Sequence, residues 1–189
     1  VPARPTFIKK ELSGGGPLLD IGVHILDLTY WFMGCPRVQS VKGVTFTKLA
    51  QREDVHGLWG EWDREAYDVE DFAAGFIRFT NGAAISLSCS FLANITIIED
   101  FSTILYGTEA GLHWPNGKLA TEKSGVLQDI ELHLSEMPEV RPHTEEIRAF
   151  LEAVKEDKPV PVKPEESLEV IKMLEGIYQS AETGAEVNF

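Results

Sequence analysis

The chain has 189 residues, of which 43% are hydrophobic and 25% are charged, and its formal net charge is −13. This length and composition are typical of one globular domain that buries a hydrophobic core. A surface this acidic repels phosphate backbones and anionic lipid, and no apolar stretch approaches the roughly 20 residues that span a bilayer, so neither nucleic acid nor a membrane is an expected partner.

The sequence begins with Val1 rather than Met, and its densest motif is reached by residue 14. We therefore expect this chain to be a part of a longer protein. Residues 1–12 contain two prolines and a basic stretch, which predicts an extended segment. The two cysteines, Cys35 and Cys89, favour a cytoplasmic protein over a disulfide-stabilised one.

A helix is predicted from Pro17 to about Met33, because proline suits the first turn and Gly34 follows as a stop. Apolar residues lie on nearly every face of this helix, which predicts that it is largely buried. Asp20, His24 and Asp27 are spaced i, i+4, i+7 and therefore lie on one stripe.

This stripe allows three interpretations. A histidine with carboxylates one turn away on each side is suited to general acid–base catalysis, because the carboxylates fix its tautomer and tune its pKa. The same histidine could instead be a hydrogen-bonded structural residue of a buried helix. A metal site is the third reading, but it lacks a further ligand at suitable spacing and no cysteine joins the cluster. Gly22, in mid-helix, suggests close packing against the backbone.

Strands dominate the next part of the chain. We predict strands at 41–47, 72–80, 83–91 and 102–107, with Asn81-Gly82 as the turn of a hairpin and a second hairpin around Asn116-Gly117. In the strand at 83–91, Ile85 and Leu87 alternate with small polar residues. A further strand at 128–135 is expected to place Ile130, Leu132 and Leu134 inward. Residues 48–70 show no clear period and are read as a long loop or insertion.

Two helices close the chain. The first carries Ile147, Phe150, Leu151 and Val154 at helical spacing, and the second begins at about Pro164 and ends at Gly184. Strands in hairpins with helices segregated from them predict an α+β fold. We expect residues 1–189 to form a single domain, an open, mainly antiparallel sheet with helices on one face and the other face free for oligomerisation.

The motif from Gly14 to Asp27 resembles the G-G-G-x-L-x-D-x-G-x-H-x-x-D signature of the glucose–fructose oxidoreductase, inositol dehydrogenase and rhizopine-catabolism (Gfo/Idh/MocA) family. The resemblance continues through residues 71–82, 106–111 and the closing helices, and leaves only 48–70 without a match.

This resemblance implies a C-terminal substrate and oligomerisation domain whose N-terminal Rossmann domain is absent here. It implies an NAD(P)-dependent oxidoreductase acting on a sugar, polyol or related hydroxyl compound, with His24 as the acid/base and Asp20 assisting it. The family's lysine of an E-K-P motif would lie in the absent domain, so the fragment alone is expected to be inactive. The Gly14–Gly16 triplet does not follow a clear strand and lacks G-x-G-x-x-G spacing, so no cofactor is expected in this chain. No metal is expected either, because the stripe of Asp20, His24 and Asp27 lacks a further ligand at suitable spacing.

Other residues are weaker candidates. Asp27, Asn94, Thr96 and Glu99 could contact substrate, although the last three suit a solvated loop equally well. His56, Trp59 and Trp62 could cap a sugar-binding cleft or form a hydrophobic loop cluster. The resemblance and the serine-bearing strand favour a homodimer or homotetramer. The alternative function is a non-catalytic oligomerisation or ligand-binding module of the same fold.

Overall fold

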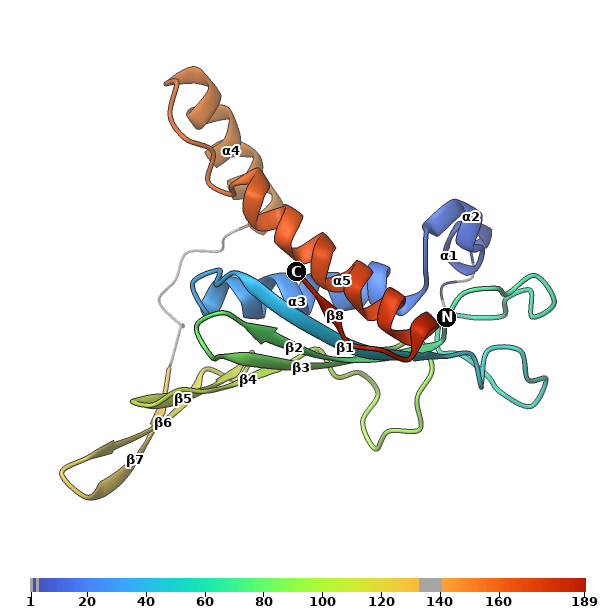
Figure 1. The fold of residues 1–189 in the computed structure, drawn as a ribbon, viewed down its shortest axis with the longest axis horizontal. Coiled ribbons are helices and arrows are strands. Elements are labelled where there is room, and N and C mark those ends of the chain that lie inside the picture. The colour runs from blue at the N-terminus through green and yellow to red at the C-terminus, as the bar shows by residue number, and fades with distance from the viewer. Residues whose placement is uncertain (1, 3, 133–140) are drawn as a thin grey trace. The chain divides into compact units, whose positions relative to one another are not determined.

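The computed structural model describes residues 2, 4–132 and 141–189 (Figure 1). These residues form two compact units, one made of 1–98 and 168–189 and the other of 99–167. The elements are α1 (Pro5–Ile8), α2 (Lys10–Ser13), a π-helical turn (Leu18–Gly22), α3 (Val23–Phe32), β1 (Val38–Phe46), β2 (Phe72–Phe79), β3 (Ala84–Ser90), β4 (Thr103–Tyr106), β5 (Ala110–Trp114), β6 (Lys118–Lys123), β7 (Val126–Glu131), α4 (Pro142–Lys155), α5 (Pro164–Thr183) and β8 (Val187–Asn188).

The first unit contains an antiparallel sheet in the order β3-β2-β1-β8. Asn81-Gly82 forms the turn between β2 and β3, as predicted, and Gly82 has the positive φ of +87° that favours glycine. Both α3 and α5 lie on one face of this sheet (Figure 1). The prediction of an antiparallel sheet with helices on one face is therefore correct for this unit.

Glycines let α5 approach the sheet. A Cβ on Gly43 of β1 would lie 2.7 Å from Ile177 Cγ2, and one on Gly75 of β2 would lie 2.6 Å from Ile177 Cδ1. Ile177 is fully buried. On the same face, the rings of Tyr30 in α3 and Phe79 in β2 stack at a centroid distance of 5.9 Å. These contacts build the core that holds both helices.

The opposite face of this sheet carries small and apolar side chains together with the exposed cations Lys42 and Arg78. Phe76 of β2 is 50% exposed, and Val44 and Phe46 of β1 are 42% and 44% exposed. In the register of the sheet, Ala74 lies between Val44 and Ser88. Along β3 the side chains alternate as predicted from the sequence, with Ile85 and Leu87 buried and Ser86 and Ser88 exposed.

The chain is helical rather than extended at Pro5–Ile8 and Lys10–Ser13, which corrects the prediction of an extended segment for this part of residues 1–12. Pro5 occupies the first turn of α1, where its missing N–H costs no hydrogen bond. Ile8, at the end of α1, packs into a cluster with parts of the 48–70 loop. This loop contains no helix or strand, as expected, but the cluster gives it a core of its own.

The second unit adds a separate antiparallel sheet in the order β4-β5-β6-β7, so the prediction of one open sheet was wrong. The hairpin at Asn116-Gly117 joins β5 and β6 as expected. Every residue of β7 is exposed, and Ile130 and Leu132 are 45% and 47% exposed, so these side chains do not point into a core. His133, Leu134 and Ser135 lie outside the described residues.

The helix α4 has the predicted position, but its apolar stripe is not buried. Ile147, Phe150, Leu151 and Val154 are between 52% and 63% exposed. Helical spacing of apolar residues shows that a helix has an apolar face and does not identify what covers it.

Candidate functional site

The helix that carries the predicted catalytic residues does not begin as a regular α-helix. Residues Leu18–Gly22 form a π-helical turn, and α3 continues from Val23 to Phe32. Such π-helical segments are uncommon and occur often at functional sites. Asp20 lies inside the π-helical turn, and His24 lies one turn later at the start of α3.

The stripe of Asp20, His24 and Asp27 is on the outer side of this helix. His24 and Asp27 are exposed and Asp20 is half-buried, whereas Leu18 and Leu26 are fully buried. The expectation of a largely buried helix is therefore wrong for this stripe. The structure places the histidine where a ligand can reach it, and a buried structural role does not describe it.

Asp20 and His24 interact electrostatically. Partial burial raises the pKa of the Asp20 carboxyl above its ordinary value, and the nearby His24 partly offsets this rise. An imidazole beside a carboxylate that is only partly hydrated can exchange a proton with a bound hydroxyl group, while the carboxylate stabilises the imidazolium.

The opposite side of the helix is held by close packing. A Cβ on Gly22 would lie 2.9 Å from the Sγ atom of Cys89 in β3, which confirms the expectation that a neighbour packs against the backbone there. Burial, with a smaller effect of Glu70, raises the pKa of the Cys89 thiol to about 12. Cys89 is therefore a neutral packing residue under the helix.

The start of the helix is held by Glu70, a residue that the sequence did not single out. The Gly16 amide donates to Glu70 Oε2 at 2.9 Å, and the Leu18 amide donates to Oε1 at 3.1 Å. The Tyr178 hydroxyl of α5 also donates to Oε1, at 2.9 Å. No local pattern marks Glu70, because its partners are 52 or more residues away in the chain.

The glycine triplet is filled by the protein's own groups. A Cβ on Gly15 would lie 2.1 Å from the Tyr178 hydroxyl oxygen, and one on Gly16 would lie 2.2 Å from the Glu70 carbonyl oxygen. Gly14 has a positive φ of +80°. These glycines are required by internal packing and by a sharp turn.

The remaining weaker candidates, Asn94, Thr96 and Glu99, follow β3 in the chain. Asn94 and Thr96 are exposed in the loop after β3, and Glu99 belongs to the second unit. Trp62 lies in the buried cluster of the 48–70 loop, where its Nε1 donates to the Ala50 carbonyl at 2.7 Å. The hydrophobic-cluster interpretation therefore applies to Trp62, while Trp59 is 60% exposed.

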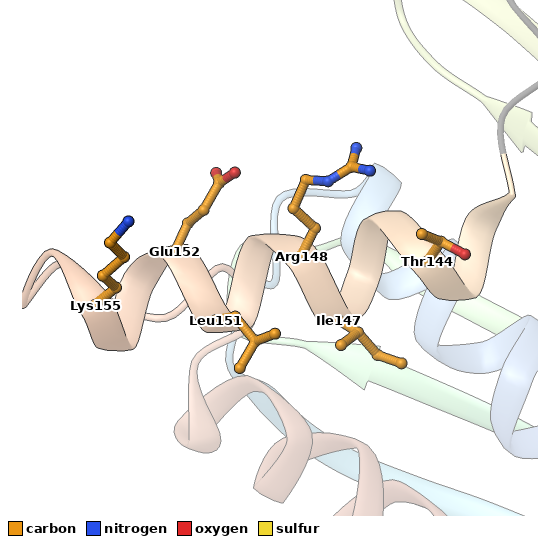
Figure 2. A pocket seen from close by; sticks show the side chains of 6 residues that line it. All are labelled: Thr144, Ile147, Arg148, Leu151, Glu152 and Lys155. Carbon is orange, nitrogen blue, oxygen red and sulfur yellow. The ribbon is translucent and has the colours of Figure 1, made fainter.

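Six side chains of α4 line a pocket in the second unit (Figure 2). Ile147 and Leu151 project from the same side of the helix, with Arg148 and Glu152 on another. None of the predicted site residues lines this pocket. Among the described residues, no group of three or more His, Cys, Asp or Glu side chains is arranged to hold a metal ion. None of the helices in the described ranges is long and apolar enough to cross a membrane.

Comparisons with known proteins identify the family to which this chain belongs. The family profile described as "Oxidoreductase family, C-terminal alpha/beta domain", of the Gfo/Idh/MocA group, matches residues 6–189. D-glucoside 3-dehydrogenase of Escherichia coli K12 is 37% identical over 188 residues, which are 99% of this chain and 52% of that protein. The chain thus spans about half the length of this relative.

Two solved structures illustrate the shared fold. An oxidoreductase domain protein from Kribbella flavida has a TM-score of 0.79 at 19% identity, covering 100% of this chain and 53% of its own. A levoglucosan dehydrogenase in complex with NADH has a TM-score of 0.74 at 20% identity, covering 99% of this chain and 53% of its own. In both cases this chain corresponds to half of the larger protein.

Proposed function

The chain belongs to the Gfo/Idh/MocA oxidoreductase family and matches its C-terminal α/β domain, and from this premise we propose that it is the substrate-side half of an NAD(P)-dependent dehydrogenase acting on a sugar, polyol or related hydroxyl compound. The proposal rests on the position of the exposed His24 and the half-buried Asp20 on one side of a helix. The other side of this helix packs closely against the sheet through Gly22 and Cys89. The relative that oxidises a D-glucoside supports a sugar as the substrate class.

In the oxidation direction, His24 accepts the proton of the substrate hydroxyl as that carbon loses a hydride. NAD or NADP, held mainly by the half that this chain does not span, supplies the hydride acceptor when bound. His24 returns the proton when the carbonyl is reduced. Asp20 orients the imidazole and stabilises its protonated form, and Asp27, one turn further on, accepts a hydrogen bond from a neighbouring substrate hydroxyl.

We also propose that the chain assembles as a homodimer or homotetramer through the helix-free face of β1, β2 and β3. The small side chains of Ala74 and Ser88 allow a second flat surface to approach closely, and Val44, Phe46 and Phe76 supply apolar area. Because the net charge of −13 opposes association, such an interface must be large and well fitted. The low number of cysteines supports a cytoplasmic location.

The test is an activity assay of the longer protein that contains this chain and its nucleotide-binding half. Glycosides, free aldoses and polyols are offered with NAD and with NADP, and formation of the reduced nicotinamide is followed. Oxidation of at least one of these compounds is expected, with α-hydroxy acids as the control class. Saturable sugar binding without any turnover would instead support a non-catalytic binding module.

A further inference from the structure

Glu70 is a buried carboxylate that accepts its hydrogen bonds from neutral donors. Its residue is 7% exposed, and no salt bridge within 2, 4–132 and 141–189 involves it. The side chain accepts two backbone N–H groups, of Gly16 and Leu18, and the phenol of Tyr178. A buried carboxylate costs several kcal/mol unless hydrogen bonds satisfy it, so this arrangement needs a reason.

The two amides belong to the start of the helix that carries Asp20 and His24. The first N–H groups of any helix lack partners within the helix, and Pro17, at the cap position, offers no side-chain hydrogen bond. Glu70 takes the place of a local cap, and its negative charge also suits the positive end of the helix dipole.

Gly16 links Glu70 to Asp20 through two hydrogen bonds of its backbone. Gly16 donates its N–H to Glu70, and its carbonyl accepts the amide of Asp20 at 3.1 Å. The Glu70 carboxylate therefore binds the backbone amides on both sides of Pro17, those of Gly16 and Leu18, and so holds the first turn of the π-helical segment. A shift of Glu70 would move Asp20, which is the residue that interacts with His24.

Glu70 is in turn held rigidly. The Tyr67 hydroxyl donates to its carbonyl oxygen at 2.9 Å, and the same carbonyl lies where a Cβ on Gly16 would clash. The next residue, Asp71, accepts the amides of three successive loop residues, Lys48, Leu49 and Ala50, at 2.6–2.9 Å. The backbone at 70–71 is thus anchored independently of the helix that it holds.

We infer that Glu70 is a positioning residue that sets the location of the helix bearing Asp20 and His24, and so the geometry of proton transfer in the proposed reaction. The catalytic part of this inference rests on the proposed function. The structural part does not, because it concerns the amides of residues 16–24 in this chain.

The test compares two neighbouring buried carboxylates that cap different segments. Glu70→Gln keeps the shape of the side chain but presents an NH₂ group to either the Gly16 amide or the Leu18 amide. Asp71→Asn can keep an oxygen at the three loop amides but removes the negative charge to which they donate, and it serves as the neighbouring control. Hydrogen exchange of single amides is measured by NMR in this chain, and kcat and KM are measured in the longer protein.

Glu70→Gln is expected to speed amide exchange across residues 16–24, while Asp71→Asn speeds it at 48–50 and leaves 16–24 protected. In the longer protein, Glu70→Gln should lower kcat on the order of 10- to 100-fold with a change of less than about threefold in KM, because a small displacement of reacting groups is costly and substrate contacts remain. Asp71→Asn should lower the melting temperature but keep kcat near that of the unmodified protein.

Unchanged exchange at 16–24 in Glu70→Gln would overturn the inference, and so would an equal loss of kcat in both variants. If the unmodified longer protein oxidises no sugar or polyol, the proposed function fails, and the exchange measurement still decides whether Glu70 holds the helix. If Glu70→Gln does not fold, Glu70→Asp is measured in the same way, since its carboxylate is one methylene too short to meet both amides.

Discussion

The backbone of Gly22 packs directly against the side chain of Cys89. Only glycine allows this approach, because a Cβ at position 22 would lie 2.9 Å from the Cys89 Sγ atom. Through this contact the helix that carries Asp20 and His24 packs against β3. It also turns the stripe of these two residues away from the sheet, so that the same packing that stabilises the helix leaves His24 exposed.

Gly22→Ala should therefore destabilise the chain by about 1–3 kcal/mol, the usual cost of overpacking a core. The added methyl must displace the sulfur or the helix. Removing the sulfur with Cys89→Ala should relieve part of this cost, so the double mutant should be more stable than the sum of the single changes by about 0.5 kcal/mol or more. Urea unfolding of the four proteins measures the coupling. Strict additivity would show that the two residues do not press on each other.

Asp20→Asn should change how stability depends on pH. Because burial raises the pKa of Asp20 in the fold above its ordinary value of 3.8, its protonated form is favoured there, and the stability that this gives is lost as the pH rises through the folded pKa. The asparagine variant has no such loss and should gain stability relative to the unmodified chain as the pH is raised from below 3.8 toward neutral. Thermal unfolding of both proteins tests this. Parallel curves over that range would contradict partial burial of the carboxylate.

The isolated chain should bind neither NAD nor NADP measurably and should show no dehydrogenase activity. Its glycine triplet is occupied by Tyr178 and Glu70, and the Gly16 amide already has a carboxylate partner. Titration calorimetry with each dinucleotide at millimolar concentration is the measurement. Saturable binding of either dinucleotide would show that this chain contributes more to the cofactor site than we propose.

Ser88→Arg should disrupt assembly. Ser88 lies in one row with Ala74 and Val44 on the helix-free sheet face, and a long charged side chain there holds a second flat surface away. The unmodified chain and the Ser88→Ala control should both exceed the monomer mass of 21.0 kDa in light scattering at micromolar concentration, while Ser88→Arg should approach it. Circular dichroism checks that the fold is retained. A monomeric mass for the unmodified chain would refute the proposed interface.

Local patterns in the sequence predicted most of the elements of the fold. Asn81-Gly82 marked a hairpin because few other pairs adopt its turn, and Pro164 and Gly184 marked α5 because each has a distinct backbone role at a helix end. The i, i+4, i+7 spacing predicted the stripe of Asp20, His24 and Asp27, and the resemblance of residues 14–27 to a family motif suggested the roles of His24 and Asp20.

Contacts between distant residues could not be predicted in this way. Glu70 caps a helix that begins 52 residues earlier, and no spacing rule connects two such positions. The exposed stripe of α4 and the exposure of Ile130 and Leu132 were missed for a related reason. Periodicity identifies the face of an element that is apolar, whereas burial depends on which other elements pack against that face.

The most direct test of the proposed function is the pH dependence of turnover for His24→Ala in the longer protein, with the exposed histidine His143 changed to alanine as the control. Loss of a general acid–base residue lowers turnover by a factor on the order of 10²–10⁴. We expect a loss of this size for His24→Ala, with a smaller change in substrate affinity and near-normal turnover for His143→Ala. Near-normal turnover of His24→Ala from about pH 6 to pH 9 would contradict the assignment of His24 as the proton-transferring residue.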